Sequence, residues 1–287
     1  MSSIKIILEK MNTTLIDGLA NYSLPIHSTN LKEINQTTSD SEKEKIVSIN
    51  SLIGKNIEIS FTNNIFCCDC GKKTKKSFGQ GFCYPCFIKS PFNAECIIRP
   101  ELCKAHLREG RDVDWEIKNH IQPHIVYLAW SSHYKVGVTR QTQVPTRWID
   151  QGAYLAAPVA ECPNRYLAGC VEVALKEHFS DKTSWQKMLK FEPDMFLNTQ
   201  SFLEKHNEVI EKLPSELSKY SVKDTPPVLS ISYPVHHQLT KVKSQRLDKV
   251  PVISGKLMGI KGQYLIFDSD NVFNVRSHTG YEVNLNA

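Results

Sequence analysis

The amino-acid sequence predicts an α+β protein made of three parts. These are a small antiparallel sheet with flanking helices, a zinc ribbon or knuckle, and a β-rich domain built from the two ends of the chain. Three patterns support this interpretation: strand-like alternation at both ends, two closely spaced CxxC pairs, and a hairpin followed by an amphipathic helix. A length of 287 residues is enough for two or three small domains.

The expected division of the chain follows these patterns in order. An N-terminal β segment covers residues 1–65, a zinc-binding segment 66–120, an α/β module 121–227, and a C-terminal β meander 228–287. Neither terminal segment has enough strands to form a stable sheet alone, so we expect the two to pair.

Short strands are expected in the N-terminal segment over Lys5–Met11, Ala20–Ile26 and Ile46–Phe61. The polar insert at residues 28–45 has almost no apolar side chains, so we expect a mobile loop there. After residue 228 the strand pattern returns, with turn signals at residues 268–271 and 277–280. This spacing predicts an antiparallel meander.

Four cysteines form the strongest local signal of the sequence: Cys67, Cys70, Cys83 and Cys86. Two CxxC pairs separated by twelve residues are typical of a zinc site that four thiolates hold on two turns. The alternatives are four free cysteines at accidental spacing, and a Cys68-x-Cys70 pair in place of the first CxxC. Because four thiolates leave no open coordination position, the expected zinc ion is structural.

Disulfides are the rival interpretation of these cysteines. The N-terminal sequence is too short and too charged for a signal peptide, and no apolar run is long enough to span a membrane. We therefore expect a cytoplasmic protein without a membrane partner, and a reducing compartment favours zinc over disulfides.

A weaker cluster of possible ligands follows the four cysteines. Cys96, Cys103 and His106 could hold a second zinc ion together with a later histidine, either His120 or His124. The sequence offers no clean four-ligand pattern here, and buried or surface side chains without metal remain an equal alternative.

Basic residues gather in the middle of the chain. The formal net charge is +5, and residues 66–150 alone carry thirteen basic and eight acidic side chains. Between the two CxxC pairs the chain carries a run of lysines, and Arg140 ends the second hairpin strand: Lys72, Lys73, Lys75, Lys76 and Arg140. Such a set predicts contacts with the phosphates of DNA or RNA, the alternative being a solvated loop.

The α/β module begins with a hairpin. HIVYLAW and YKVGVTR flank a tight polar turn, and Pro145 suits the first position of a short helix that Gly152 can end. Farther along, apolar residues at helical spacing predict an amphipathic helix: Leu167, Cys170, Val171, Ala174 and Leu175. Glu172 projects from a different face of that helix, so the core does not require it.

The order of these motifs resembles the GIY-YIG endonuclease superfamily, in particular its short members with a KVG-type second motif. The matching positions are Val126-Tyr127, Lys135-Val136-Gly137, Arg147 and Glu172. The resemblance implies that Tyr127 and Lys135 assist an attacking water, Arg147 stabilises the transferring phosphate, and Glu172 holds Mg²⁺ or Mn²⁺.

This sequence also departs from that pattern. Lys135 stands where active nucleases usually carry a tyrosine, and Gln151 where many carry a histidine or tyrosine. The late asparagine of the site has no clear counterpart, with Asp181-Lys182-Thr183 roughly in its place. Three functions stay open: a metal-dependent nuclease, a nucleic-acid-binding protein without cleavage, and a protein-interaction scaffold. The oligomeric state is open as well.

Over residues 65–189 the chain also resembles an uncharacterised bacterial family, through TKKSFGQGFCYPCF, RPELC, VYLAWSSHYKVGVTR and PTRWIDQGA. That resemblance implies an architecture and no activity. The sequence contains no Walker loop, GxGxxG or GxSxG motif, which argues against P-loop nucleotide hydrolases, dinucleotide-binding enzymes and serine hydrolases.

Overall fold

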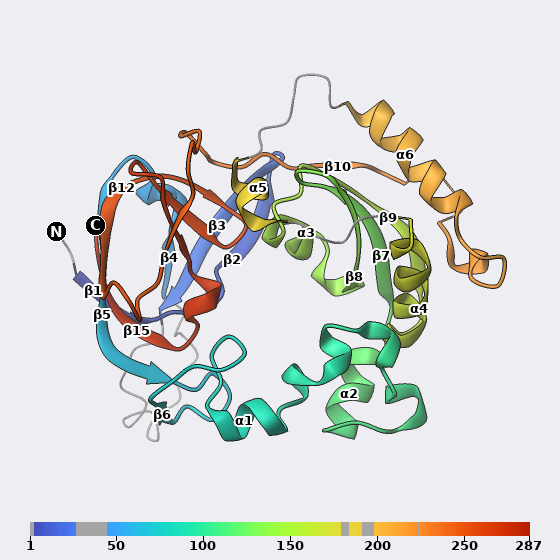
Figure 1. Ribbon diagram of the computed structural model, residues 1–287, viewed down its shortest axis with the longest axis horizontal. Coiled ribbons are helices and arrows are strands. Elements are labelled where there is room, and N and C mark those ends of the chain that lie inside the picture. Colours follow the sequence, from blue (N-terminus) through green and yellow to red (C-terminus); the bar gives the residue numbers. More distant parts are fainter. Residues whose placement is uncertain (1–2, 27–44, 179–183, 191–197, 223, 225) are drawn as a thin grey trace. The chain divides into compact units, whose positions relative to one another are not determined.

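The chain has an α+β architecture and forms two compact units. Unit 1 contains Met1–Ile88 and Tyr233–Ala287, and unit 2 contains Lys89–Ser232. The computed structural model (Figure 1) describes residues 3–26, 45–178, 184–190, 198–222, 224 and 226–287. Apart from Lys45, the polar insert that we expected to be a loop lies outside this range.

Unit 1 is built on an eight-stranded sheet in the order β1-β15-β5-β12-β13-β14-β11, with β6 paired to β5. All neighbours are antiparallel except β11 and β14, which are parallel. The strands are β1 (Ser3–Ile7), β5 (Asn56–Phe66), β6 (Lys73–Thr74), β11 (Lys243–Gln245), β12 (Val252–Lys261), β13 (Tyr264–Phe267), β14 (Asn271–Asn274) and β15 (Tyr281–Asn286). Because β1 and β5 both pair with β15, the prediction that the two chain ends build one sheet is confirmed.

Buried apolar pairs fix the register of this sheet. Ile6 lies opposite Val283, and Ile59 lies opposite Leu285, and all four side chains are buried. A slip by one residue would turn each of these side chains to the other face, so burial specifies a single pairing.

Several expected strands differ in the structure. The strand expected over Ile46–Phe61 is split into β4 (Lys45–Ser48) and β5 by a short 3₁₀ helix, Asn50–Leu52. A strand that we did not expect, β2 (Asn12–Ile16), forms a separate sheet with β3 (Leu19–Ile26) and β4. The C-terminal meander covers only β12, β13 and β14, because β15 leaves it to pair between β1 and β5.

Unit 2 contains a four-stranded antiparallel sheet in the order β10-β9-β7-β8. The hairpin strands are β7 (His124–Trp130) and β8 (Tyr134–Arg140), and their neighbours are β9 (Leu155–Cys162) and β10 (Leu229–Ser230). Residues 229–230 therefore pair in unit 2 and not in the terminal sheet, where we had expected them. The helices are α2 (Val113–His120), α3 (Thr146–Asp150), α4 (Arg165–Lys176), α5 (Trp185–Lys190) and α6 (Thr199–Glu211).

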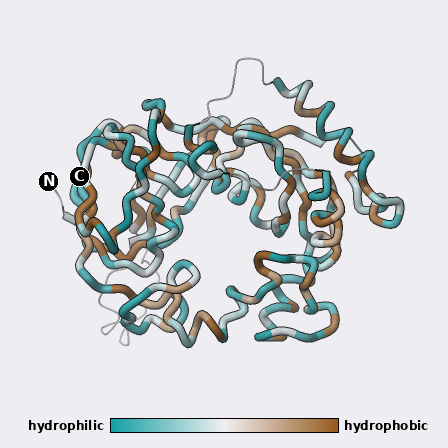
Figure 2. The backbone as a smooth tube through the Cα atoms, viewed as in Figure 1, coloured by the Kyte–Doolittle hydropathy of each residue, from teal (hydrophilic) through white to brown (hydrophobic). Residues whose placement is uncertain are grey.

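Helices α4 and α6 pack on one face of this sheet. Val126 and Leu128 of β7 share a buried core with Val171 and Leu175 of α4 and with Phe202 of α6. Asparagine side chains cap both helices at their N-termini, as Asn164 does by accepting a hydrogen bond from Leu167 N at 2.9 Å. Along α6, hydrophobic and hydrophilic residues alternate (Figure 2), as expected for a helix with one buried face.

Candidate functional sites

Four cysteine thiols converge in unit 1, as the spacing predicted. The Sγ atoms of Cys67, Cys70, Cys83 and Cys86 all lie within 4.8 Å of one another. The distance between Cys70 Sγ and Cys83 Sγ is 3.8 Å. A tetrahedral zinc ion with Zn–S bonds of about 2.3 Å places its ligands about 3.8 Å apart. The cluster is therefore consistent with a structural zinc ion, and Cys68 is not part of it.

Short turns bring these thiols together. Gly71 follows the first pair with φ +68°, and its N–H donates to the Cys67 carbonyl at 2.9 Å, which turns the chain back. The second pair opens α1 (Tyr84–Lys89), on which Cys86 lies one turn after Cys83. The backbone N–H of Cys83 donates to Cys67 Sγ at 3.2 Å and so ties the two pairs together.

The Cys67 thiol ionises more readily than an ordinary cysteine. Burial by itself raises its pKa, but the backbone N–H groups of Cys70, Cys83 and Asp69 favour the thiolate and lower the pKa to about 7. The thiolate is the form that binds metal, so this shift favours binding at Cys67, whereas the hydrogen bond to Asp69 raises the pKa of the Cys86 thiol.

The C-terminal part of unit 1 is hydrogen-bonded to the residue before Cys67. Phe66, the last residue of β5, donates its N–H to the Gly280 carbonyl at 2.7 Å. Gly280 has φ +88°, and a Cβ there would lie 2.2 Å from the Phe66 carbonyl oxygen. Only glycine fits this close backbone approach, which fixes the end of the strand from which Cys67 projects.

Lysines face solvent next to the four thiols. Lys72, Lys73, Lys75 and Lys76 are all exposed, and Lys73 lies on β6. Together with Phe61 and Asp248, Lys73 and Lys75 line a groove of about 670 Å³. The fold thus presents cations beside an aromatic ring at a hollow in the surface.

Three of the residues expected in the nuclease-like site influence one another electrostatically in unit 2. The Tyr127 hydroxyl donates to Gln151 Oε1 at 2.8 Å, and the charges of Arg147 and Glu172 act on it. Burial raises the pKa of Tyr127, the positive charge of Arg147 opposes that rise, and the negative charge of Glu172 adds to it. The three charged or polar groups come from β7, α3 and α4.

Gly137 leaves space for the Tyr127 side chain, and the Trp148 ring packs near the Tyr127 ring. Tyr127 pairs with Gly137 across the hairpin, and a Cβ at position 137 would lie 2.7 Å from the tyrosine hydroxyl. The Trp148 ring lies 5.8 Å from the Tyr127 ring, centre to centre. The glycine of the KVG motif therefore has a packing role: the tyrosine ring lies where any larger residue would place its side chain.

Glu172 also has a second partner, and two further expected residues, Lys135 and Arg140, lie among other neighbours. Lys135 lies opposite Ala129 on the same face of the hairpin as Tyr127, and it is buried. Glu172, also buried, pairs with Lys176 one turn farther along α4, at 3.4 Å. Arg140 Nη1 donates to Asn119 Oδ1 of α2 at 2.7 Å. The segment Asp181-Lys182-Thr183 lies outside the described residues.

The family described as protein of unknown function (DUF2797) matches residues 54–283. The chain belongs to the DUF2797 family. No curated protein matches the chain, and no solved structure matches it. The region shared with DUF2797 includes the four-cysteine cluster and the residues around Tyr127, so the expected membership in an uncharacterised family is confirmed. No match is to a GIY-YIG nuclease, and that resemblance stays a prediction.

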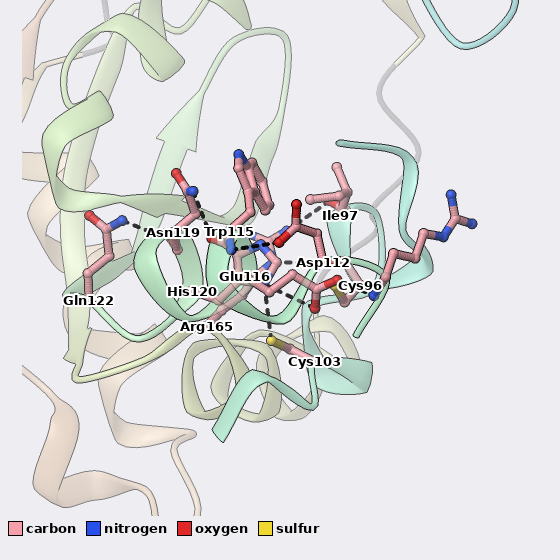
Figure 3. A network of polar contacts seen from close by, with 11 residues as sticks. Cys96, Ile97, Cys103, Asp112, Trp115, Glu116, Asn119, His120, Gln122 and Arg165 are labelled. Carbon is pink, nitrogen blue, oxygen red and sulfur yellow. Dashed lines mark hydrogen bonds and ion pairs between the residues drawn. The ribbon is translucent and has the colours of Figure 1, made fainter. Parts of the chain in front are cut away.

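The second group of ligands predicted in this DUF2797 protein forms in part. Cys96 Sγ, Cys103 Sγ and one ring nitrogen of His120 lie within 4.8 Å of one another, and all three residues are buried. His106 is exposed and stacks on Tyr166 at 4.6 Å between ring centres, outside the group. Glu116, which our sequence reasoning missed, lies one helical turn before His120 (Figure 3). A Glu–x3–His spacing on one helix face was the available signal.

None of the described helices is long and apolar enough to cross a membrane.

Proposed function

We propose that this protein is a nucleic-acid-binding zinc protein whose second unit is a GIY-YIG nuclease-like core. The observation that carries the proposal is that the charges of Arg147 and Glu172 both act on the Tyr127 hydroxyl, although the three residues come from separate elements of unit 2. Their order along the chain is the order that the resemblance implies: tyrosine on the first strand, KVG on the second, arginine on the first helix and glutamate on a later one.

The chemistry at Tyr127 supports a neutral hydroxyl. Its pKa is raised, chiefly by burial, so the phenol keeps its proton at neutral pH. Its hydrogen bond to Gln151 and its proximity to Arg147 suit it to orient the guanidinium. Arg147 is then the group that meets a phosphate, with the planar donor geometry that phosphate recognition uses.

Cleavage of the phosphodiester bond is the second candidate function, and Glu172 favours it. This carboxylate is the group that would hold Mg²⁺ or Mn²⁺ together with the phosphate itself, and the metal would stabilise the charge developing on the phosphate. The ion pair with Lys176 at 3.4 Å competes for the same carboxylate. Binding therefore needs only Arg147 and the surface lysines, whereas cleavage also requires that Lys176 release Glu172.

The lysines beside the four-cysteine cluster supply the rest of the binding proposal. Four exposed ammonium groups on one loop favour phosphates through counterion release, which makes the affinity fall steeply with salt. Phe61 in the adjoining groove offers a ring on which an unpaired base can stack.

The test is a panel of labelled single-stranded, duplex and branched DNA and structured RNA, incubated with zinc-loaded protein in Mg²⁺, Mn²⁺ or EDTA. Gel shift reads binding and product bands read cleavage in the same tubes. Glu172→Gln tests the metal ligand, and Glu177→Gln, an exposed change at the end of α4, is its matched control. Metal-dependent cutting that only Glu172→Gln abolishes establishes the nuclease.

Binding by the lysines of unit 1 is tested separately. Lys72→Ala with Lys75→Ala should weaken the shift and reduce the dependence of log K on log salt by about two, if both lysines contact duplex phosphates. Lys243→Ala with Lys256→Ala, exposed lysines of unit 1 that do not line the groove, is the control pair. Gel shifts without cleavage products would mean that the protein binds nucleic acid but does not cleave it. The absence of a gel shift with every nucleic acid at low salt would refute the proposal.

A further inference from the structure

We infer that unit 2 contains a second structural metal site, independent of the proposed function, in which Cys96, Cys103, His120 and Glu116 bind one zinc ion. The first three already place their ligand atoms within 4.8 Å of one another. Cys103 Sγ lies 3.4 Å from His120 Nδ1. A tetrahedral zinc ion with bonds of about 2.3 Å to sulfur and about 2.0 Å to nitrogen separates two such ligands by about 3.5 Å.

Glu116 supplies the fourth ligand. Its side chain is buried, its Oε1 accepts a hydrogen bond from Arg111 N at 2.8 Å, and its Oε2 lies 3.9 Å from His120 Nδ1 (Figure 3). Ligands on one zinc ion need an oxygen–nitrogen separation of about 3.4 Å, so the carboxylate has to approach His120 by about half an ångström. Glu116 is outside the group of atoms that lie within 4.8 Å of one another, so its side chain also has to turn toward the two sulfurs when the ion binds.

The backbone is shaped around this carboxylate. A Cβ at Gly110 would lie 2.4 Å from the Glu116 carboxyl carbon, so the glycine leaves room for the buried acid. A buried carboxylate is strongly unfavourable unless a cation neutralises it or it is fully hydrogen-bonded. Beside two cysteines and a histidine, coordination to a divalent ion would give the carboxylate a partner in addition to the Arg111 N–H.

The ligand set selects the metal and its role. Thiolate ligands with an imidazole favour zinc over magnesium or calcium, which prefer oxygen. The four residues are all buried, and four protein ligands leave no coordination position for water or substrate. The ion would therefore stabilise structure and not act on a substrate.

The site fastens an irregular segment to helix α2. Cys96 and Cys103 lie on and just after short 3₁₀ helices, Glu95–Ile97 and Pro100–Leu102, which have few backbone hydrogen bonds of their own. Arg165, the first residue of α4, donates to the carbonyls of Cys96 at 2.8 Å and Ile97 at 2.9 Å (Figure 3). These bonds orient the cysteine-bearing loop, as outer partners of metal ligands commonly do.

The first test is metal content of the full chain after purification without added chelator. Zinc should be present at two equivalents per chain, one in each cluster. Cys103→Ser should lower it to one, while Cys162→Ser, an equally buried cysteine outside both clusters, should leave two. The inference is overturned if the parent protein contains one equivalent of zinc and Cys96 and Cys103 either react with a thiol reagent or form a disulfide.

A second test does not depend on whether Cys103→Ser folds. In Cys70→Ser with Cys83→Ser, the four-cysteine site is removed and unit 2 is untouched. X-ray absorption of the remaining zinc should show two sulfur and two nitrogen or oxygen ligands. Four sulfur ligands, or no zinc at all, would refute the assignment. Glu116→Gln should weaken zinc affinity at least tenfold, whereas Glu109→Gln, exposed nearby, should not change it.

Discussion

Helix α4 approaches the chain before α2 so closely that there is no room for one additional methyl group between them. Gly169 is buried in the middle of α4, and a Cβ there would lie 2.1 Å from Glu101 N and 2.4 Å from the Pro100 carbonyl carbon. Ordinary contact begins at 3.4 Å, so Gly169→Ala requires a shift of about 1.3 Å. Both sides of the contact are backbone, and neither can rotate away.

Two opposing terms set the size of the effect. Alanine favours a helix interior over glycine by about 1 kcal/mol. Overpacking costs about 1–3 kcal/mol, and rigid backbone on both sides places this contact at the upper end. We therefore expect Gly169→Ala to lower the free energy of unfolding of unit 2 by about 1–2 kcal/mol.

The assay is urea unfolding followed by tryptophan fluorescence, which reports on unit 2 because all four tryptophans lie within residues 115–185. Val173→Ala on the same helix is the control: its side chain is 41% exposed, so the free energy should change by no more than about 0.5 kcal/mol. A Gly169→Ala protein that is more stable than the parent by the full helix propensity would show that α4 does not contact Glu101, and the packing described above would be wrong.

Three further predictions follow from single residues. Burial lowers the pKa of His124 from 6.5 to about 4, so below pH 6.5 the unfolded chain binds a proton that the folded chain does not. The free energy of unfolding of unit 2 should therefore fall by up to about 3 kcal/mol between pH 6.5 and 4. The fall should be smaller in His124→Gln and unchanged in the control His178→Gln, which alters an exposed histidine. Gly280→Ala should lower the free energy of unfolding of unit 1 by about 1–3 kcal/mol, because Gly280 has φ +88° and its backbone lies against the Phe66 carbonyl. Thermal unfolding followed by circular dichroism measures this, and an unchanged melting curve contradicts it. Tyr127→Phe should cost about 1 kcal/mol in urea unfolding through the lost bond to Gln151, and an equally stable variant would mean that water replaces that bond.

The interpretation of the cysteines shows where sequence is sufficient. Cys67 with Cys70, and Cys83 with Cys86, are each close along the chain, and glycines beside them allow the turns that the ligands need. The grouping of these four therefore followed from spacing alone. His106 was expected in the second group by the same reasoning and lies outside it, because His120 reaches Cys103 from a helix seventeen residues away.

The sheet of unit 1 shows the opposite limit. Alternating patterns predicted strands at both ends of the chain, and the small number of strands at each end predicted that the ends pair. The pattern did not predict that β15 lies between β1 and β5, or that β11 runs parallel to β14. Strand neighbours depend on contacts between residues far apart in the chain, which periodicity along one strand does not record.

The sequence by itself determined the local features of this protein: the four-cysteine cluster, the hairpin, the amphipathic α4 and the excess of lysines. Only the tertiary structure decided which side chains meet. It placed the Tyr127 ring against Gly137 with its hydroxyl on Gln151, and it buried Glu116 with His120 near Cys103. The physical reason is that turns and helices follow from neighbouring residues, whereas buried polar groups find their partners only when separate elements pack together.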